Sequence, residues 1–245
     1  MQRKNLPAMS SRLLSAAVSA GFDLSRAVHL LRAGGVVIFP TETLYGLGCI
    51  ATNADAVARV YQLKRRPVHK PLPLLAADTA QVSAVADLEG MPPGLYAFWP
   101  GPLTVLLPGR QSLPSVLKDA HGRVAVRVTS HPLAAALALQ AGGTLTASSA
   151  NRSGLPAVRR AGELDPSLLS ALAACCDGIM ANLVQHDTGV AELTIPILTD
   201  GPQPAGGLPS TIVEPLHDAA GRRVRVLRDG AISAAQLTAA GFVLA

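Results

Sequence analysis

Apolar residues recur along this chain in two patterns, which predict two kinds of element. In the first pattern they lie three or four positions apart, as in residues 54–65, and this spacing is typical of an amphipathic helix. Asp23 or Ser25 can cap another such helix, which should end at the glycine pair 34–35. Further helices are expected over residues 78–88, 133–141, 163–176 and 233–240.

The second pattern is a short run of consecutive aliphatic residues, as in Val36–Phe39, which stops at Pro40. Such runs are typical of strands that are buried on both faces. Because they alternate with the helices, the sequence predicts an α/β domain with a sheet covered by helices. We expect one domain over residues 23–245, preceded by a lead-in over residues 1–22. The other expected strands are residues 72–76, 103–107, 124–128, 144–147, 195–199, 210–213 and 224–227.

Composition excludes several classes of protein. The chain has 245 residues, of which 49% are hydrophobic and only 15% are charged, so it is not intrinsically disordered. No apolar run reaches the length of about eighteen residues that a transmembrane helix needs. Serines and Arg12 interrupt the apolar stretch near the N-terminus, which is therefore not read as a secretory signal. Three cysteines without metal-ligand spacing predict buried thiols in the cytoplasm.

Positive charge is concentrated in one short segment. Residues 59–70 contain five basic residues and no acidic one, which equals the net charge of +5 for the whole chain. A solvated helix end would explain these cations, but Pro67 and Pro71 stiffen the segment and keep the bases together. The cluster therefore indicates a polyanionic ligand, either nucleotide phosphates or RNA.

Short polar side chains follow several of the predicted strands. They include Thr41 and Thr43 after the first strand, and Ser149 and Asn151 after strand 144–147. Ligands of open α/β sheets bind beyond the strand ends, where hydroxyls, amides and arginines can hold phosphate or carboxylate oxygens. Arg127, Ser210 and Arg228 lie at comparable positions in other strands.

Several familiar catalytic motifs are missing from the sequence. There is no P-loop, no G-x-S-x-G elbow and no acidic cluster for two-metal chemistry, and the six histidines are scattered. Gly46-x-Gly48-x-x-Ala51 resembles a dinucleotide fingerprint, but the region about twenty residues further on is basic rather than acidic. A site of hydroxyls and bases positions anions, and Mg²⁺ would arrive on the phosphates of the ligand.

Six blocks of sequence, in order, resemble the signature blocks of the YrdC-type (TsaC-type) threonylcarbamoyl-AMP synthases. Together they extend over nearly the whole chain, in an arrangement that is similar to the single-domain branch of the family. The blocks are PTETLYGLG (Pro40–Gly48), LKRRPVHKPLPLL (Leu63–Leu75), WPGPLT (Trp99–Thr104), VAVRV (Val124–Val128), SSANRSG (Ser148–Gly154) and LPSTIVE (Leu208–Glu214).

The resemblance implies a fold, a reaction and a set of site residues. The fold would be a twisted open mixed β-sheet flanked by helices, with a concave, positively charged cavity. The enzyme would make L-threonylcarbamoyladenylate from L-threonine, bicarbonate and ATP, with Mg²⁺ carried by ATP, and pass it to threonylcarbamoyl transferase proteins that modify tRNA. The implied catalytic residues are Lys64, Arg66, Ser149 and Asn151, which would hold ATP together with Lys70 and Arg228. L-Threonine would contact Thr41, Thr43, Arg127, Ala147 and Ser210.

Three positions depart from the family pattern, and two other functions stay open. Lys70 stands where Asn is common, Leu75 where His is common in the longer branch, and Thr129 where Pro often follows the strand arginine. The main alternative is a module that binds double-stranded RNA or ribosomal intermediates through the same basic cavity, although aromatic residues for base stacking are scarce. Carbamoyl transfer in metalloenzyme maturation uses a similar domain fused to others.

Overall fold

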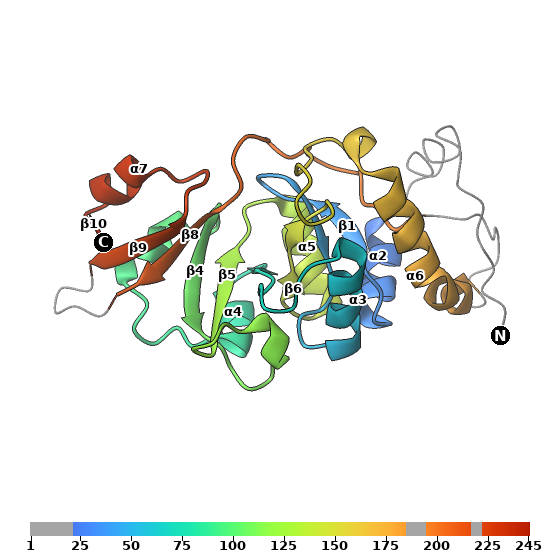
Figure 1. The fold of residues 1–245 in the computed structure, drawn as a ribbon, viewed down its shortest axis with the longest axis horizontal. Coiled ribbons are helices and arrows are strands. Elements are labelled where there is room, and N and C mark those ends of the chain that lie inside the picture. The colour runs from blue at the N-terminus through green and yellow to red at the C-terminus, as the bar shows by residue number, and fades with distance from the viewer. Residues whose placement is uncertain (1–21, 185–194, 217–221) are drawn as a thin grey trace.

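The computed structural model of the protein describes residues 22–184, 195–216 and 222–245. The chain forms an elongated α/β structure, in which the C-terminal strands and the N-terminal helices lie at opposite ends (Figure 1). Strands and helices alternate as the sequence predicts. The predicted lead-in lies, apart from residue 22, outside the described residues.

A seven-stranded mixed sheet extends along most of the molecule. β3 pairs with β5, β4 with β8, and β9 with β10 in parallel, whereas the other neighbours are antiparallel. The strand order is β10 (Val243–Leu244), β9 (Arg223–Arg228), β8 (Thr211–Pro215), β4 (Leu103–Pro108), β5 (Arg123–Val128), β3 (Leu74–Ala76) and β6 (Leu145–Thr146).

A second, three-stranded antiparallel sheet contains β1 (Val37–Pro40), β2 (Tyr45–Gly48) and β7 (Ser148–Ser149). The chain crosses from the large sheet to the small one between β6 and β7, so the single strand expected over 144–147 is divided between the two sheets. Ser149 thereby pairs with Gly46. This crossing brings the polar residues after β6 beside those after β1.

Side chains cap most of the helices at their N-termini. Asp23 caps α2, Asn53 caps α3 and His131 caps α5, and each accepts a hydrogen bond from a backbone N–H of the first turn. None of the helices in the described part of the chain has the length and hydropathy that a membrane crossing requires. The α-helices are α2 (Leu24–Arg32), α3 (Ala54–Lys64), α4 (Thr79–Val85), α5 (Pro132–Ala141), α6 (Pro166–Val184) and α7 (Ala234–Ala239), and the 3₁₀ helices are η1 (Pro93–Phe98), η2 (Ser115–Leu117) and η3 (Ala161–Glu163).

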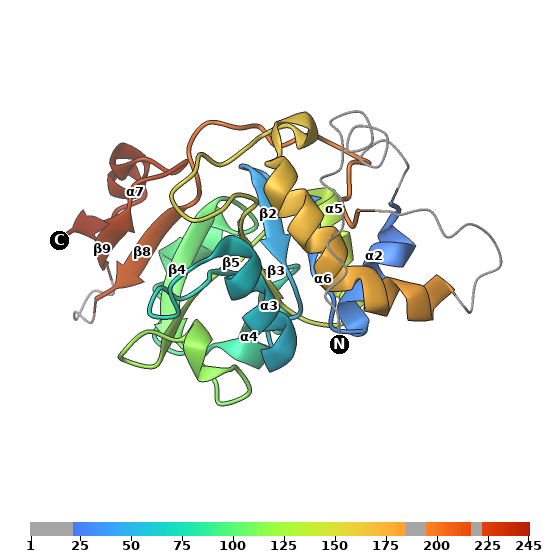
Figure 2. The same cartoon turned by 45° about the vertical axis from the view of Figure 1, so that its right-hand side comes forward.

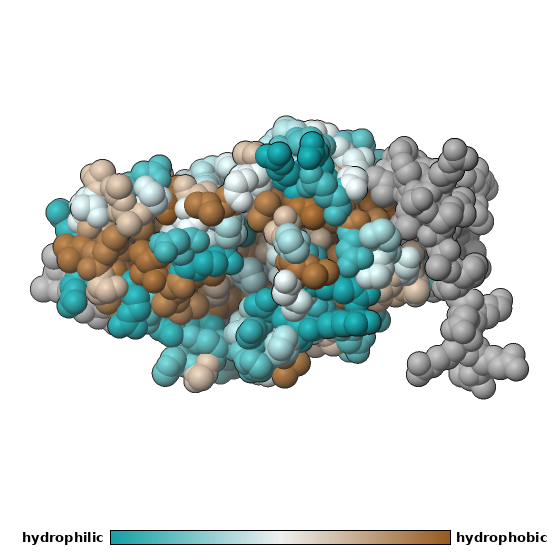
Figure 3. Space-filling view, turned by 45° about the horizontal axis from the view of Figure 1, so that its top comes forward, coloured by the Kyte–Doolittle hydropathy of each residue, from teal (hydrophilic) through white to brown (hydrophobic). Residues whose placement is uncertain are grey.

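The helices pack around an aliphatic core, with α4 against β3 and β5 in the middle of the molecule (Figure 1). α2, α3, α5 and α6 surround the small sheet, and α7 packs at the far end beside β10 (Figures 1 and 2). The buried side chains are mainly Leu, Val, Ile and Ala, as the low aromatic content requires. Hydrophobic atoms also reach the surface over the C-terminal strands, where Leu227 and Val243 are exposed (Figure 3).

The elements differ from the sequence prediction at several further places. Helix α4 ends at Val85, because Ala86 is extended and bridges Gly109. Residues 195–199 form only an isolated bridge between Ile197 and Ile38 rather than a strand. No strand was predicted at β2 or at β10. In these places pairing with another segment decides the local structure.

Gly48 tests the close approach of the two sheets. A Cβ at this position would lie 1.8 Å from the carbonyl oxygen of Thr146, which is backbone and cannot move away alone. We expect Gly48→Ala to lower the free energy of unfolding by about 3 kcal/mol, because the two segments must separate. Urea denaturation measures this change.

The matched control is Gly178→Ala in α6, where an added Cβ meets nothing within 4 Å. This substitution should raise stability by up to about 1 kcal/mol, since alanine has the higher helix propensity. Equal unfolding free energies for Gly48→Ala and the wild type would contradict the description of the sheet crossing.

Candidate functional site

A cavity of about 390 Å³ lies where the two sheets meet. Segments far apart in the sequence contribute to its wall: the 41–46 turn, the 147–151 crossing, strand ends of the large sheet and the segment that leads into β8. The lining residues are Thr41, Thr43, Leu44, Tyr45, Gly46, Arg66, Pro73, Arg127, Ala147, Ser148, Ser149, Asn151, Leu155, Ala157, Gly207, Pro209, Ser210 and Arg228.

Three arginines face this cavity, and its lining contains no aspartate or glutamate. Partial burial lowers the pKa of Arg228, and repulsion from Arg127 and Arg66 lowers it further. Burial also lowers the pKa of Arg66. A ligand with several negative charges would relieve their repulsion.

Arg127 is held by a carboxylate behind the cavity wall. Its Nε donates to Oε1 of Glu42 at 2.8 Å, and both side chains are almost fully buried, with 5% and 9% exposure. Burial alone would raise the pKa of Glu42, but the charge of Arg127 and the Thr129 hydroxyl outweigh it and hold this pKa below its ordinary value. Glu42 is therefore ionised, and it fixes the Arg127 guanidinium from one side.

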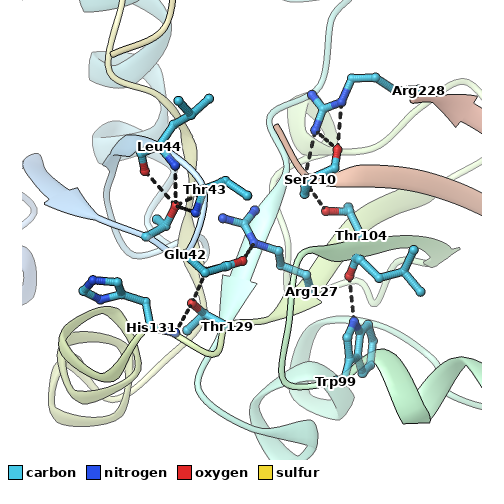
Figure 4. Close-up of polar contacts among 12 residues, drawn as sticks. Glu42, Thr43, Leu44, Trp99, Thr104, Arg127, Thr129, His131, Ser210 and Arg228 are labelled. Atoms are coloured by element: carbon cyan, nitrogen blue, oxygen red, sulfur yellow. Dashed lines mark hydrogen bonds and ion pairs between the residues drawn. The ribbon is translucent and has the colours of Figure 1, made fainter. Parts of the chain in front are cut away.

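The turn after β1 presents two threonines to the cavity. The Thr41 hydroxyl donates to the carbonyl of Leu44 at 2.7 Å and accepts from the backbone N–H groups of Thr43 and Leu44, both at 3.3 Å. These bonds close the turn and leave the Thr43 hydroxyl 3.3 Å from that of Thr41 (Figure 4). Hydroxyl groups such as these can donate to and accept from a polar ligand.

Arg228 reaches the cavity from β9 and is held by Ser210. Its Nη2 donates to the Ser210 carbonyl at 2.6 Å and to the Ser210 hydroxyl at 2.9 Å, and its Nε donates to the same carbonyl at 3.1 Å. The Ser210 hydroxyl lies 2.8 Å from the buried hydroxyl of Thr104 on β4. Figure 4 shows Arg228 and Ser210 across from the Thr41–Thr43 turn, with Arg127 between them.

The loop after β7 is held from beneath by Lys64. The Lys64 ammonium is 1% exposed and donates to the carbonyl of Ser149 and, at 2.6 Å, to that of Asn151. Burial and the nearby Arg66 lower the pKa of Lys64 to about 7. The Ser149 hydroxyl donates to Oδ1 of Asn151, whose Nδ2 donates to the carbonyl of Leu155. The loop is therefore ordered by side chains on both sides.

The structure gathers most of the sequence-predicted residues in one cavity wall. Nine of the eleven line it, and Lys64 lies directly behind it, where it bonds to the backbone. Lys70 is exposed and is not among the lining residues. The nine lining residues are Thr41, Thr43, Arg66, Arg127, Ala147, Ser149, Asn151, Ser210 and Arg228.

Two polar residues at the site were not singled out from the sequence. Glu42, which stands between the predicted residues Thr41 and Thr43, forms an ion pair with Arg127. Thr104, in the WPGPLT block, lies within hydrogen-bond distance of the Ser210 hydroxyl. An acid inside an otherwise basic set of site residues is itself a signal, because a buried carboxylate needs a cationic partner.

No cysteine, histidine or acidic residue is among the described residues that line this cavity. Cys49 and Cys176 are buried, Cys175 is partly buried, and all three are free thiols. Burial raises the pKa of Cys49 to about 12, so this thiol is not reactive. Within the part of the chain that the structure describes, no three His, Cys, Asp or Glu side chains form a group that could hold a metal ion.

Comparison with known proteins gives consistent matches. The family model Sua5_yciO_yrdC, described as "Telomere recombination", matches residues 29–195. The chain is 48% identical over 137 residues to a threonylcarbamoyl-AMP synthase of Methylococcus capsulatus, a match that covers 55% of this chain and 74% of the relative. It is 42% identical over 166 residues to that of Stenotrophomonas maltophilia, covering 66% of this chain and 89% of the relative.

A solved structure with a similar fold is that of P. abyssi Sua5 complexed with L-threonine. Its TM-score is 0.69, its sequence identity is 28%, and the match covers 91% of this chain. This chain spans 58% of the length of the P. abyssi chain. The likeness of fold therefore extends over most of this chain.

Lys64 offers a test of how the cavity wall is held. Lys64→Met keeps the length of the side chain but leaves the carbonyls of Ser149 and Asn151 without their donor. We expect the free energy of unfolding to fall by about 1–3 kcal/mol, as measured by chemical denaturation. Lys70→Met is the matched control, because this lysine on the same segment is exposed. If both variants were as stable as the wild type, the supporting role of Lys64 would be wrong.

Proposed function

The chain belongs to the Sua5/YciO/YrdC family, and from this premise we propose that it is a threonylcarbamoyl-AMP synthase that makes L-threonylcarbamoyladenylate from L-threonine, bicarbonate and ATP, releasing pyrophosphate. The observation that carries the proposal is the cavity with three arginines, several hydroxyls and no carboxylate in its lining. Two substrates of this reaction, ATP and bicarbonate, are anions, and L-threonine carries a carboxylate.

The phosphates of ATP are assigned to the side of the cavity that holds Arg66 and Arg228. Both guanidinium groups can neutralise phosphate oxygens, and Ser149 and Asn151 line the same cavity. Lys64 acts here through the loop, because its ammonium is already bonded to two loop carbonyls. The exposed Lys70 adds a cation outside the cavity and can meet only a phosphate that extends beyond the lining residues.

L-Threonine is assigned to the side that holds Arg127. A guanidinium that is fixed at Nε by Glu42 keeps its two terminal nitrogens for a carboxylate. The hydroxyls of Thr41, Thr43 and Ser210 and the small Ala147 lie around it in the cavity lining. The P. abyssi relative complexed with L-threonine supports this substrate.

The reaction needs positioned anions rather than a side-chain nucleophile. The amine of L-threonine bonds to the carbon of bicarbonate with loss of water, which gives a carbamate. A carbamate oxygen then attacks the α-phosphorus of ATP, and the bond to the β-phosphate oxygen breaks as pyrophosphate leaves with the electron pair. Arginines that stabilise the developing charge, and a rigid loop that holds the reactants in line, suffice for such a transfer.

Mg²⁺ is assigned to the phosphates of ATP rather than to a protein site. The cavity lining offers hydroxyl and amide oxygens but no carboxylate, and Mg²⁺ keeps several waters and binds through phosphates in such sites. The product is an activated carbamoyl group for the modification of tRNA, and a threonylcarbamoyl transferase would consume it in the cytoplasm.

Pyrophosphate release tests the reaction directly. With ATP and Mg²⁺ present, we expect release only when both L-threonine and bicarbonate are added, because the attacking oxygen belongs to the carbamate. Omitting either substrate should reduce the rate to background. Release without L-threonine would indicate plain ATP hydrolysis, and no release from folded protein would contradict the proposal.

Arg66 tests the assignment of the phosphates. Arg66→Ala should lower turnover by about 100-fold or more, since one fixed cation at developing phosphate charge is lost. Its guanidinium also donates to the carbonyls of Lys70 and Pro71, so thermal denaturation must accompany the assay. Arg65→Ala is the matched control, because Arg65 is exposed and lies outside the cavity lining. Equal rates for a folded Arg66→Ala and the control would remove Arg66 from the phosphate site.

A further inference from the structure

The hydroxyl of Thr129 lies behind the Arg127–Glu42 ion pair. It donates to Oε2 of Glu42 at 2.5 Å, and it accepts from the backbone N–H of His131 at 3.1 Å (Figure 4). Thr129 itself is 2% exposed. Its backbone N–H donates to the carbonyl of Ala76 on β3, so the residue is anchored to the sheet independently of its side chain.

The direction of these hydrogen bonds is determined by chemistry. A hydroxyl has one proton, and an N–H group can only donate. An ionised carboxylate can only accept, so the Thr129 proton must point to Glu42, while the Thr129 oxygen accepts from the N–H of His131. The bond is therefore charge-assisted and of the stronger class.

Both oxygens of Glu42 are thereby assigned. Oε1 accepts from Nε of Arg127 at 2.8 Å and Oε2 accepts from Thr129. A carboxylate held at both oxygens is restrained from rotating, so it restrains the orientation of the guanidinium to which it is bonded. Within the described residues, the two terminal nitrogens of Arg127 have no hydrogen-bond partner, and Arg127 lines the cavity.

We propose that Thr129 is a positioning residue for L-threonine: through Glu42 it holds the Arg127 guanidinium in the orientation that receives the substrate carboxylate. This inference rests on the proposed function for the identity of the substrate. The proline that often follows the strand arginine in the family has no side-chain donor, so this way of holding Glu42 belongs to chains that, like this one, have a hydroxyl here. Valine has the shape of threonine but would leave one oxygen of a nearly buried carboxylate without its donor.

The experiment has two readouts, one of which needs no ligand. The first is the Nε–Hε NMR signal of Arg127, which should exchange slowly with water in the wild type because the group is buried and bonded to Glu42. The second is the dissociation constant for L-threonine from calorimetry. We expect Thr129→Val to accelerate Hε exchange and to weaken L-threonine binding by about tenfold. Thr129→Ser should restore both.

A double-mutant cycle separates positioning from general loss of structure. Thr129→Val also leaves the His131 N–H without its acceptor. The effect of Thr129→Val is therefore measured both in the wild type and in the Glu42→Gln variant. If Thr129 acts through Glu42, Thr129→Val should cause no further loss of binding in the Glu42→Gln background. A loss that persists there would assign the effect to His131 and overturn the proposal.

The matched control is Thr144→Val. Thr144 is likewise a buried threonine, and its hydroxyl donates to the carbonyl of Gln81, but the residue does not line the cavity. The Thr144→Val substitution should leave Hε exchange and L-threonine binding unchanged. Wild-type exchange and affinity in Thr129→Val would overturn the proposal. Wild-type protein that binds no L-threonine, with exchange still dependent on Thr129, would contradict the proposed substrate and leave the positioning role intact.

Discussion

Repulsion between three guanidinium groups around one cavity is the constraint on which the site depends. Arg66, Arg127 and Arg228 come from three separate parts of the chain, and the pKa of Arg228 is lowered by burial and by both of the others. Such groups would turn away from one another if their side chains were free. Each is instead held by hydrogen bonds to fixed acceptors. The three cations therefore stay near one another, and an anion that enters the cavity relieves their mutual repulsion.

The acceptors differ in a way that matches the proposed ligands. Arg127 is bonded to a carboxylate, whereas Arg66 and Arg228 are bonded to carbonyl oxygens and a hydroxyl. Glu42 therefore offsets part of the positive charge at Arg127 and bonds only to its Nε. The other two arginines keep their full charge, which suits polyphosphate rather than a single carboxylate.

The crossing of the chain between the two sheets produces the other half of the site. Residues 145–149 leave the large sheet, pass so close to Gly48 that no Cβ fits there, and join the small sheet. The loop that follows carries Ser149 and Asn151, and the buried Lys64 ammonium satisfies its carbonyls. A loop held in this way can position phosphate oxygens without rearranging, which lowers the cost of binding.

Local chemistry along the chain was enough to predict much of this protein. Cap residues such as Asp23 and aliphatic runs such as 124–128 specify their elements through nearest-neighbour geometry, so these elements lie close to where the pattern predicts them. The polar residues at strand ends were also found, because their chemical types are visible in the sequence. Tertiary structure decided the rest. The pairing of β2 with β7, the burial of Lys64 and the bonds of Glu42 depend on partners more than eighty residues away. The division of 144–149 between two sheets likewise depends on the distant strands β3 and β2, and no local pattern specifies such partners.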